Sequence, residues 1–288
     1  MSKGLLDPKV DFVFKNIFGS PNHPEILISF LNATLKAKKK IVNVDIKKTD
    51  IEKQYIEDKY SRLDVKATTS NDEIINIEIQ LKNENNMVKR SLYYLSKMYE
   101  EQLNEKEDYS KLVRTVCINI LNFKYLKTDN FHTGYRFKEI ESNEELTDIM
   151  EVHFIEIPKL QDSSDEKDML VAWTEFLKDP ESEKVRGLEL SIEEIRQAKD
   201  ELIRMSNDST QRELYDMRAN SLRDKMSELN AAERKGIEKG REEGREEGRK
   251  EGIEEGRKEE KIEIARNMKL SGLDTNTIAK ITNLSEDE

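Results

Sequence analysis

The sequence has little of several things that mark common protein classes. It contains one cysteine and three histidines, so it has no intramolecular disulfide and too few ligands for a zinc site built from these residues. No run of apolar residues approaches the roughly 20 that cross a membrane. The first residues, MSKGLLDPKVDF, lack the apolar segment of a secretory signal. These absences predict a protein of the reducing cytoplasm with no membrane partner.

Proline and aromatic residues are missing from the last part of the chain. All five prolines precede residue 181, and no aromatic residue follows Tyr215. Six of the 11 glycines recur at every fourth position between 236 and 256. The 288 residues carry a formal net charge of -11, with 38% charged residues against 35% hydrophobic ones. The chain therefore divides into a foldable N-terminal region and a polar helical tail.

Periodicity in the N-terminal region alternates between helical and extended patterns. Residues 11–35 predict a helix interrupted at GSPNHP, and 87–104 predict another one. Polar and apolar residues alternate over 62–68 and 74–80, and the turn SNDE between them predicts a β-hairpin. The apolar run at 113–121 predicts a central strand buried on both faces, with a buried thiol at its cysteine. Further strands are expected at 41–46 and near 135 and 152, so the region is an α/β or mixed α+β domain.

Two carboxylates fall on the same predicted face of this hairpin. Asp64 and Glu78 each alternate with apolar neighbours, so both point away from the apolar face of their strands. Opposed side chains on adjacent strands lie about 5 Å apart, so the two carboxylates can converge, with Gln80 beside them. Such oxygen ligands suit Mg²⁺ or Mn²⁺, which can activate a water and stabilise charge on a scissile phosphate. Two acids on the solvated face of an amphipathic sheet are the alternative, which periodicity by itself favours.

Several segments of the chain resemble one enzyme superfamily. The sequence is similar to the PD-(D/E)XK nucleases, and more closely to their recombination-promoting nuclease or putative transposase branch, in FVFKNIFG, LISFLNATL, RLDVKATTSNDEIINIEIQ, RSLYYLSKMYEEQL and VHFIEIPKL. The resemblance covers residues 5–160, and a glycine-repeat tail is also usual in that branch. It implies an α/β fold with a restriction-endonuclease-like core, a mixed β-sheet flanked by helices, and a helical C-terminal extension.

The resemblance also implies an activity, that of a Mg²⁺-dependent DNA endonuclease associated with recombination or transposition. In the superfamily an Asp on one strand and a Glu-x-Lys on the next bind Mg²⁺ and catalyse DNA hydrolysis. Asp64 and Glu78 match these positions, and the backbone carbonyl of Ile79 is an implied further metal ligand. Gln80 stands where the pattern has lysine, although this branch commonly carries glutamine there. Because a neutral glutamine can only hydrogen-bond, the site is either a weaker nuclease or part of a catalytically impaired DNA-binding or assembly protein.

A third carboxylate and a set of DNA contacts complete the expected site. The first helix of such folds often supplies a carboxylate, for which Glu25 is the candidate; a favourable place in the first turn of a helix is the equal alternative. The net negative charge does not exclude DNA, because the local field decides binding. An ordinary solvated rim is the alternative to DNA contact, and the resemblance favours contact. The expected DNA-binding residues are Lys38, Lys39, Lys40, Lys82, Arg90, Tyr94 and Lys97.

The glycine repeat over 236–260 predicts a solvated helical spacer. Each glycine costs about 0.8–1 kcal/mol relative to alanine inside a helix. A four-residue repeat drifts by about 40° per step, so the glycines form no fixed packing face. Ile237 and Ile253 are its large apolar residues, which is too few for a coiled-coil seam. The tail can still join subunits of a homo-oligomer.

The last segment predicts two short helices about a tight turn. Gly272 is expected to end the first helix, and Asp274 or Thr275 to cap the second. This pattern is typical of a helix-turn-helix fragment or of a docking or oligomerisation hairpin, and the lack of a third helix favours the hairpin. The predicted boundaries are 1–160 for the nuclease-like domain, 161–230 for an accessory helical region, 231–262 for the glycine-repeat helix or linker and 263–288 for the hairpin.

Overall fold

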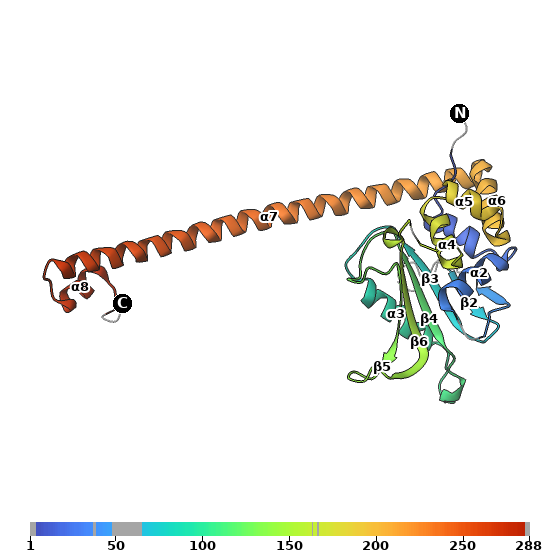
Figure 1. The fold of residues 1–288 in the computed structure, drawn as a ribbon, viewed down its shortest axis with the longest axis horizontal. Coiled ribbons are helices and arrows are strands. Elements are labelled where there is room, and N and C mark those ends of the chain that lie inside the picture. Colours follow the sequence, from blue (N-terminus) through green and yellow to red (C-terminus); the bar gives the residue numbers. More distant parts are fainter. Residues whose placement is uncertain (1–3, 37–38, 48–64, 163, 166, 286–288) are drawn as a thin grey trace. The chain divides into compact units, whose positions relative to one another are not determined.

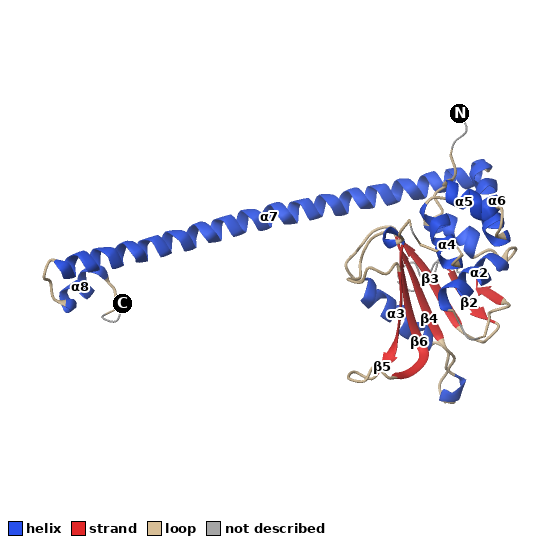
Figure 2. Ribbon diagram, in the orientation of Figure 1, coloured by secondary structure: helices blue, strands red, loops and turns tan. Residues whose placement is uncertain are grey.

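The computed structural model describes residues 4–36, 39–47, 65–162, 164–165 and 167–285 (Figure 1). The chain forms two compact units, Met1–Leu222 and Arg223–Glu288. The first unit contains a mixed β-sheet with helices on both faces (Figure 2). Its α/β architecture is the one that the order of helices and strands predicts.

The sheet has six strands in the order β1-β2-β3-β4-β6-β5. Neighbours are antiparallel from β1 to β3, parallel from β3 through β4 to β6, and antiparallel again between β6 and β5. The predicted hairpin is confirmed over its described part, where Val65 pairs with Ile77. The strands are β1 (Val44–Lys47), β2 (Val65–Thr69), β3 (Ile74–Gln80), β4 (Thr115–Leu121), β5 (His132–Lys138) and β6 (Glu145–Glu156).

The main hydrophobic core lies on one face of this sheet. Ile75, Ile77 and Ile79 of β3 point into it and meet helices that come from both ends of the unit. Trp173 packs edge-on against Phe18 at the centre of the helical layer. Short 3-10 turns lie at Tyr109–Lys111 and Ile157–Lys159. The helices on this side are α1 (Asp11–Phe18), α2 (Pro24–Leu35), α4 (Met169–Lys178), α5 (Glu183–Glu189) and α6 (Glu193–Asn207).

The opposite face of the sheet is covered by α3 (Met87–Glu100). Leu95 of this helix packs with Cys117 and Phe154 in a second, smaller cluster. All seven residues of β4 are buried between the two layers, which confirms the predicted central strand and its buried thiol. A strand buried on both faces must place its polar residues as carefully as its apolar ones, because each buried polar group needs a partner.

Two helices form the rest of the chain, α7 (Ser209–Leu270) and α8 (Thr275–Thr282). All six repeat glycines lie within α7, so the repeat is helical as predicted. Gly272 follows with a φ of 88°, a left-handed conformation that glycine adopts without steric cost. The predicted cap is confirmed at Asp274, whose Oδ1 accepts a hydrogen bond from the Thr277 backbone N–H at 3.0 Å. Within the described part of the chain, no helix combines the length and apolar character that a membrane span needs.

Candidate functional site

Glu78 lies on the face of β3 that α3 covers. Its side chain is only 1% exposed, and its neighbour on this face, Asn76, is fully buried. Asn119 of β4 is its register partner and is buried as well. The alternative that Glu78 lies on a solvated face is therefore wrong. Its strand alternates between an apolar buried face and a polar buried face, a difference that periodicity does not reveal.

A cation from α3 compensates the buried charge of Glu78. The Nε atom of Arg90 lies 3.3 Å from Oε2 of Glu78, and the arginine side chain is 22% exposed. The guanidinium carbon also lies 5.4 Å from the centre of the Tyr94 ring. A buried carboxylate is costly unless it is paired, and arginine stays protonated at any physiological pH. Arg90 thus allows an ionised carboxylate to remain inside the protein.

Polar contacts fix α3 in place above this part of the sheet. The hydroxyl of Ser91 donates a hydrogen bond to Oδ1 of Asn119 at 2.8 Å. The Nδ2 group of Asn119 in turn donates to the backbone carbonyl of His153 on β6, at 3.1 Å. Burial, together with the nearby Glu78 charge, raises the pKa of the Cys117 thiol to about 12, so this thiol stays protonated and inert. Arg90 is therefore held by a helix that is itself anchored to two strands.

Of the other residues of the expected motif, Ile79 and Gln80 lie at the end of β3, and Asp64 lies outside the described residues. Gln80 is the last residue of the strand, is partly exposed, and accepts a hydrogen bond at its carbonyl from the Asn122 N–H at 2.9 Å. The side chain of Ile79 points into the main core, so any ligand atom it offers is a backbone atom. Asp64 directly precedes Val65, which pairs with the residue before Glu78.

Glu25 does not join this group in the described structure. It lies in the first turn of α2, directly after Pro24, and its Oε1 is 3.2 Å from Nδ1 of His23. Its helix packs on the main core, whereas Glu78 lies on the α3 face. This arrangement agrees with the alternative prediction for Glu25, a favourable place in the first turn of a helix. Among the described residues no three His, Cys, Asp or Glu side chains form a group that could hold a metal, and Asp64 is not among them.

The expected DNA contacts have different surroundings. Lys39 and Lys40 are exposed before β1, Lys40 lines a cleft of about 780 Å³, and Lys38 lies outside the described residues. Lys82 is partly exposed just after β3. Lys97 is paired with Glu100 at 3.6 Å and with Glu101 at 3.8 Å, and Glu100 above all raises the pKa of this lysine. These lysines keep their ammonium groups at the surface, where phosphate contacts are made.

The aromatic contact predicted at Tyr94 needs a correction. Arg90 and Tyr94 share one face of α3 as their spacing predicts, but that face points inward and Tyr94 is only 4% exposed. Its ring cannot stack on a base in this conformation. The neighbouring Tyr93 is about half exposed and offers the ring that the sequence assigned one position later. Periodicity defines which residues share a face, not which face is covered.

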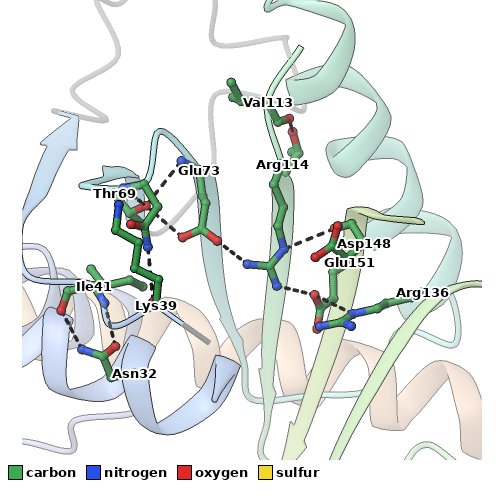
Figure 3. Close-up of polar contacts among 12 residues, drawn as sticks. Asn32, Lys39, Ile41, Thr69, Glu73, Val113, Arg114, Arg136, Asp148 and Glu151 are labelled. Carbon is green, nitrogen blue, oxygen red and sulfur yellow. Dashed lines mark hydrogen bonds and ion pairs between the residues drawn. The ribbon is translucent and has the colours of Figure 1, made fainter. Parts of the chain in front are cut away.

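A second charged cluster, which the sequence did not predict, joins the residues just before β3 and β4 to β5 and β6. Arg114 lies between Glu73 and Glu151 and forms an ion pair with each (Figure 3). Arg136 of β5 reaches the same Glu151 at 3.0 Å. Glu73 and Glu151 are buried, so each carboxylate is balanced by an arginine. The partners lie in β5 and β6 or directly before β3 and β4, which is why no local pattern reveals them.

Two histidines extend this cluster along β5 and β6. Nε2 of His153 lies 2.8 Å from Oε1 of Glu151, and its Nδ1 lies 2.9 Å from Nε2 of His132. Burial would raise the pKa of Glu151, but hydrogen bonds from His153 and Arg114 outweigh it and lower this pKa to about 2. Burial, and then the adjacent His153, lower the pKa of His132 to about 4. The cluster faces the main-core side of the sheet, away from Glu78, and its role is to tie the strands together.

A mixed sheet between two helical layers, with a buried glutamate two residues before the position of the motif lysine, is consistent with the restriction-endonuclease-like core of the PD-(D/E)XK nucleases. Comparison with protein families confirms this class: residues 8–232 match the PD-(D/E)XK nuclease family transposase model. The match covers more than half of the chain, so the chain belongs to this family. The resemblance found in the sequence is therefore confirmed. No curated protein and no solved structure matches the chain.

The end of the chain matches a second family. Residues 258–288 match the C-terminal HTH domain of the Rpn/YhgA-like nuclease family. The match begins inside α7 and continues through the turn at Gly272 into α8. It supports the helix-turn-helix interpretation rather than the docking hairpin that the sequence favoured. The first of the two predicted helices is the end of α7, which runs without a break from Ser209 to Leu270.

Proposed function

We propose that the chain is a metal-dependent DNA endonuclease that acts in recombination or transposition. The observation that carries this proposal is the buried, arginine-paired carboxylate of Glu78 in a chain of this nuclease family. A nuclease site needs an ionised carboxylate held in one position next to the substrate. Glu73 and Glu151 are also buried and arginine-paired, so what distinguishes Glu78 is its place two residues before Gln80 in a chain of this family.

The oxygen donors of this segment fit Mg²⁺ or Mn²⁺. The ligands in this proposal are the carboxylates of Asp64 and Glu78 and the backbone carbonyl of Ile79, all hard oxygen donors of the kind these ions prefer. When bound, such an ion activates a water and stabilises the charge that develops on a scissile phosphate. Gln80 then positions the water or a phosphate oxygen through its amide, since it carries no charge of its own.

The surrounding cations bind the DNA backbone in this proposal. Lys39, Lys40 and Lys82 contact phosphates, and the exposed ring of Tyr93 replaces Tyr94 as the stacking group. Lys97 and Arg90 add positive charge along α3, although both already have carboxylate partners. The C-terminal HTH segment contributes a second DNA contact. A cytoplasmic location and self-association through the tail stay predictions.

A DNA-binding or assembly protein with an impaired site is the second candidate. It is favoured by the same residues, because Gln80 is neutral where a lysine would carry charge and Arg90 already lies against Oε2 of Glu78. In that case the guanidinium takes the position of a cation, and the fold binds DNA without hydrolysing it. The two candidates differ in one measurable property, which is metal-dependent cleavage.

Cleavage of supercoiled plasmid by the full chain, with Mg²⁺, with Mn²⁺ and with a chelator, tests the proposal. We expect nicked or linear product only with metal, and at least a 100-fold loss for Asp64→Asn and for Glu78→Gln. Glu105→Gln makes the same chemical change at an exposed glutamate and should cleave as the wild type does. Cleavage that survives in Asp64→Asn would place the chemistry elsewhere. Binding without cleavage in every protein would establish the second candidate.

A further inference from the structure

The hairpin formed by β5 and β6 extends beyond the rest of the sheet. Strand β6 pairs with β4 only from Met150 onward, so its first residues have β5 as their strand partner. Strand β5 is at the edge of the sheet (Figure 2). The outer part of the hairpin is therefore a two-stranded ribbon. Such ribbons are marginally stable in water unless something packs on them.

Large apolar side chains are exposed on this ribbon. Ile140 at its tip is 93% exposed and Leu146 is 79% exposed, while Tyr135 and Phe137 on β5 are each about half exposed. Single exposed apolar residues are ordinary on a protein surface, but these four are concentrated within twelve positions of one hairpin. Concentrations of exposed apolar side chains mark sites of interaction with another macromolecule.

The charge of the ribbon excludes one class of partner. Residues 135–148, YRFKEIESNEELTD, contain five carboxylates, one lysine and one arginine, which gives a net charge of -3. The nearby Arg136 is already paired with Glu145 and Glu151. A negatively charged surface repels the phosphates of DNA and attracts a positively charged protein surface. The occupant is therefore a protein surface that is both apolar and cationic.

The outer face of α3 has this composition. Val88, Leu92 and Tyr93 are exposed on it, with the exposed ammonium group of Lys89 beside them. The first turn of the helix contains no acidic residue. Residues three and four apart share a helix face, so the three apolar side chains and the lysine form one continuous stripe.

Tyr135, where the hairpin leaves the sheet, lies on the side of the sheet that α3 covers. The ring of Tyr135 packs edge-on against Phe154, with the ring centres 6.1 Å apart. Phe154 belongs to the cluster that α3 covers. A second molecule that approaches this side can therefore meet α3 and the base of the hairpin. Each molecule offers one acidic apolar ribbon and one basic apolar helix, which suits a reciprocal two-fold contact.

We propose that the β5–β6 ribbon of one copy docks on α3 of a second copy of this chain. Ile140 and Leu146 pack on Leu92 and Tyr93 of the partner molecule, and the ribbon carboxylates face Lys89. The contact stands on exposure and charge and does not depend on nuclease activity. One consequence does rest on the proposed function: the ribbon covers α3, so self-association competes with DNA bound beside Glu78.

Sedimentation equilibrium of the full chain over a wide concentration range tests the contact. We expect the wild type to self-associate, and the dissociation constant to rise at least tenfold in Ile140→Ser/Leu146→Ser. Leu190→Ser removes an equally exposed leucine outside the ribbon and should leave association unchanged. Both changes are at exposed positions, and thermal unfolding checks that each variant is folded. A wild type that stays monomeric, or ribbon variants that associate as the wild type does, would overturn the proposal.

A charge swap tests the choice of α3 as the docking surface. Glu141→Lys/Glu144→Lys should weaken association, and adding Lys89→Glu to the same chain should restore at least part of it. Failure of this rescue would overturn the assignment to α3. A DNA-binding measurement tests whether DNA, rather than a second copy of the chain, is the partner of the ribbon. The Ile140→Ser/Leu146→Ser variant should bind DNA at least as tightly as the wild type. Weaker DNA binding by this variant would mean that the ribbon contacts DNA, and would also overturn the proposal.

Discussion

The guanidinium group of Arg90 lies against the buried carboxylate of Glu78, with Nε 3.3 Å from Oε2. Spacing along α3 placed this arginine among the DNA contacts, but the structure gives it a partner inside the protein. Ser91, the next residue, holds the helix on β4 through Asn119. The pair therefore lies at a point where the stability of the fold and the chemistry of the site depend on the same contact.

Replacement of Arg90 by methionine is expected to destabilise the fold by about 3 kcal/mol, because it leaves the Glu78 carboxylate buried without its cation. Arg90→Lys keeps a charge and should lose less. Urea unfolding of the full chain measures both changes. Adding Glu78→Gln to Arg90→Met should recover part of the loss, because the uncompensated charge is then gone.

Lys97→Met is the matched control for this pair. It also removes a cation from α3, but its ion pairs with Glu100 and Glu101 are at the surface, and we expect no measurable change in stability. Equal effects of Arg90→Met and Lys97→Met would show that burial adds nothing to the Glu78 pair.

The fold is expected to lose stability as the pH is lowered, because of His132. Its pKa is about 4 in the folded protein against a usual value of 6.5, so only the unfolded chain binds a proton between these values. The stabilisation is complete above pH 6.5 and is lost as the pH falls toward 4, by at most about 3 kcal/mol. Glu151 titrates from 4.5 toward about 2, so the range from pH 6.5 to 4.5 isolates the histidine.

Unfolding free energies measured at several pH values in this range test the histidine effect. In His132→Gln the amide can keep a hydrogen bond to His153 but cannot titrate, so the pH dependence should become shallower. His23→Gln replaces an exposed histidine and should keep the wild-type slope. A slope unchanged in His132→Gln would show that another group carries the effect.

Two glycines of the C-terminal unit should respond in opposite directions to alanine. No other part of the described chain lies within 4 Å of a Cβ built at Gly248, so Gly248→Ala should stabilise α7 locally by about 1 kcal/mol. Gly272 has a φ of 88°, which alanine adopts only with strain, so Gly272→Ala should destabilise the turn by about as much. Amide hydrogen exchange in this unit reports both. Slower exchange in both variants would contradict the left-handed turn.

The lysines before β1 should contribute to DNA affinity in a way that depends on salt. Lys39 and Lys40 are exposed, and each phosphate contact that is lost should reduce the slope of log affinity against log salt by about one. Fluorescence anisotropy with duplex DNA at several salt concentrations measures this slope for Lys39→Ala/Lys40→Ala. Lys138→Ala removes an exposed lysine beside the acidic ribbon and should leave the slope unchanged. A wild-type slope in the double variant would show that Lys39 and Lys40 do not contact DNA phosphates.

Local features of the fold were predictable because local chemistry decides them. The cap at Asp274 and the turn at Gly272 depend on side chains within a few residues of one another, and both are as predicted. The hairpin between β2 and β3 follows from alternation and a polar turn. In each case the sequence contains every group that takes part in the interaction.

The surroundings of the candidate site were not predictable in the same way. Alternation correctly put Glu78 on the face opposite Ile77, but it left open whether that face meets water or α3. Spacing correctly put Tyr94 beside Arg90, but not on the buried side of its helix. Exposure depends on which elements pack together, and those elements are far apart in the chain.

The sequence by itself determined the family of this protein, the alternation of helices and strands, and the glutamate on which its proposed chemistry depends. The tertiary structure decided what surrounds that glutamate, because only the packing of α3 on the sheet brings Arg90 to Glu78. It also brought together the strands that share Arg114 and Glu151. Charges that are buried together must balance wherever the chain places them, and that balance is a property of the fold rather than of any one segment.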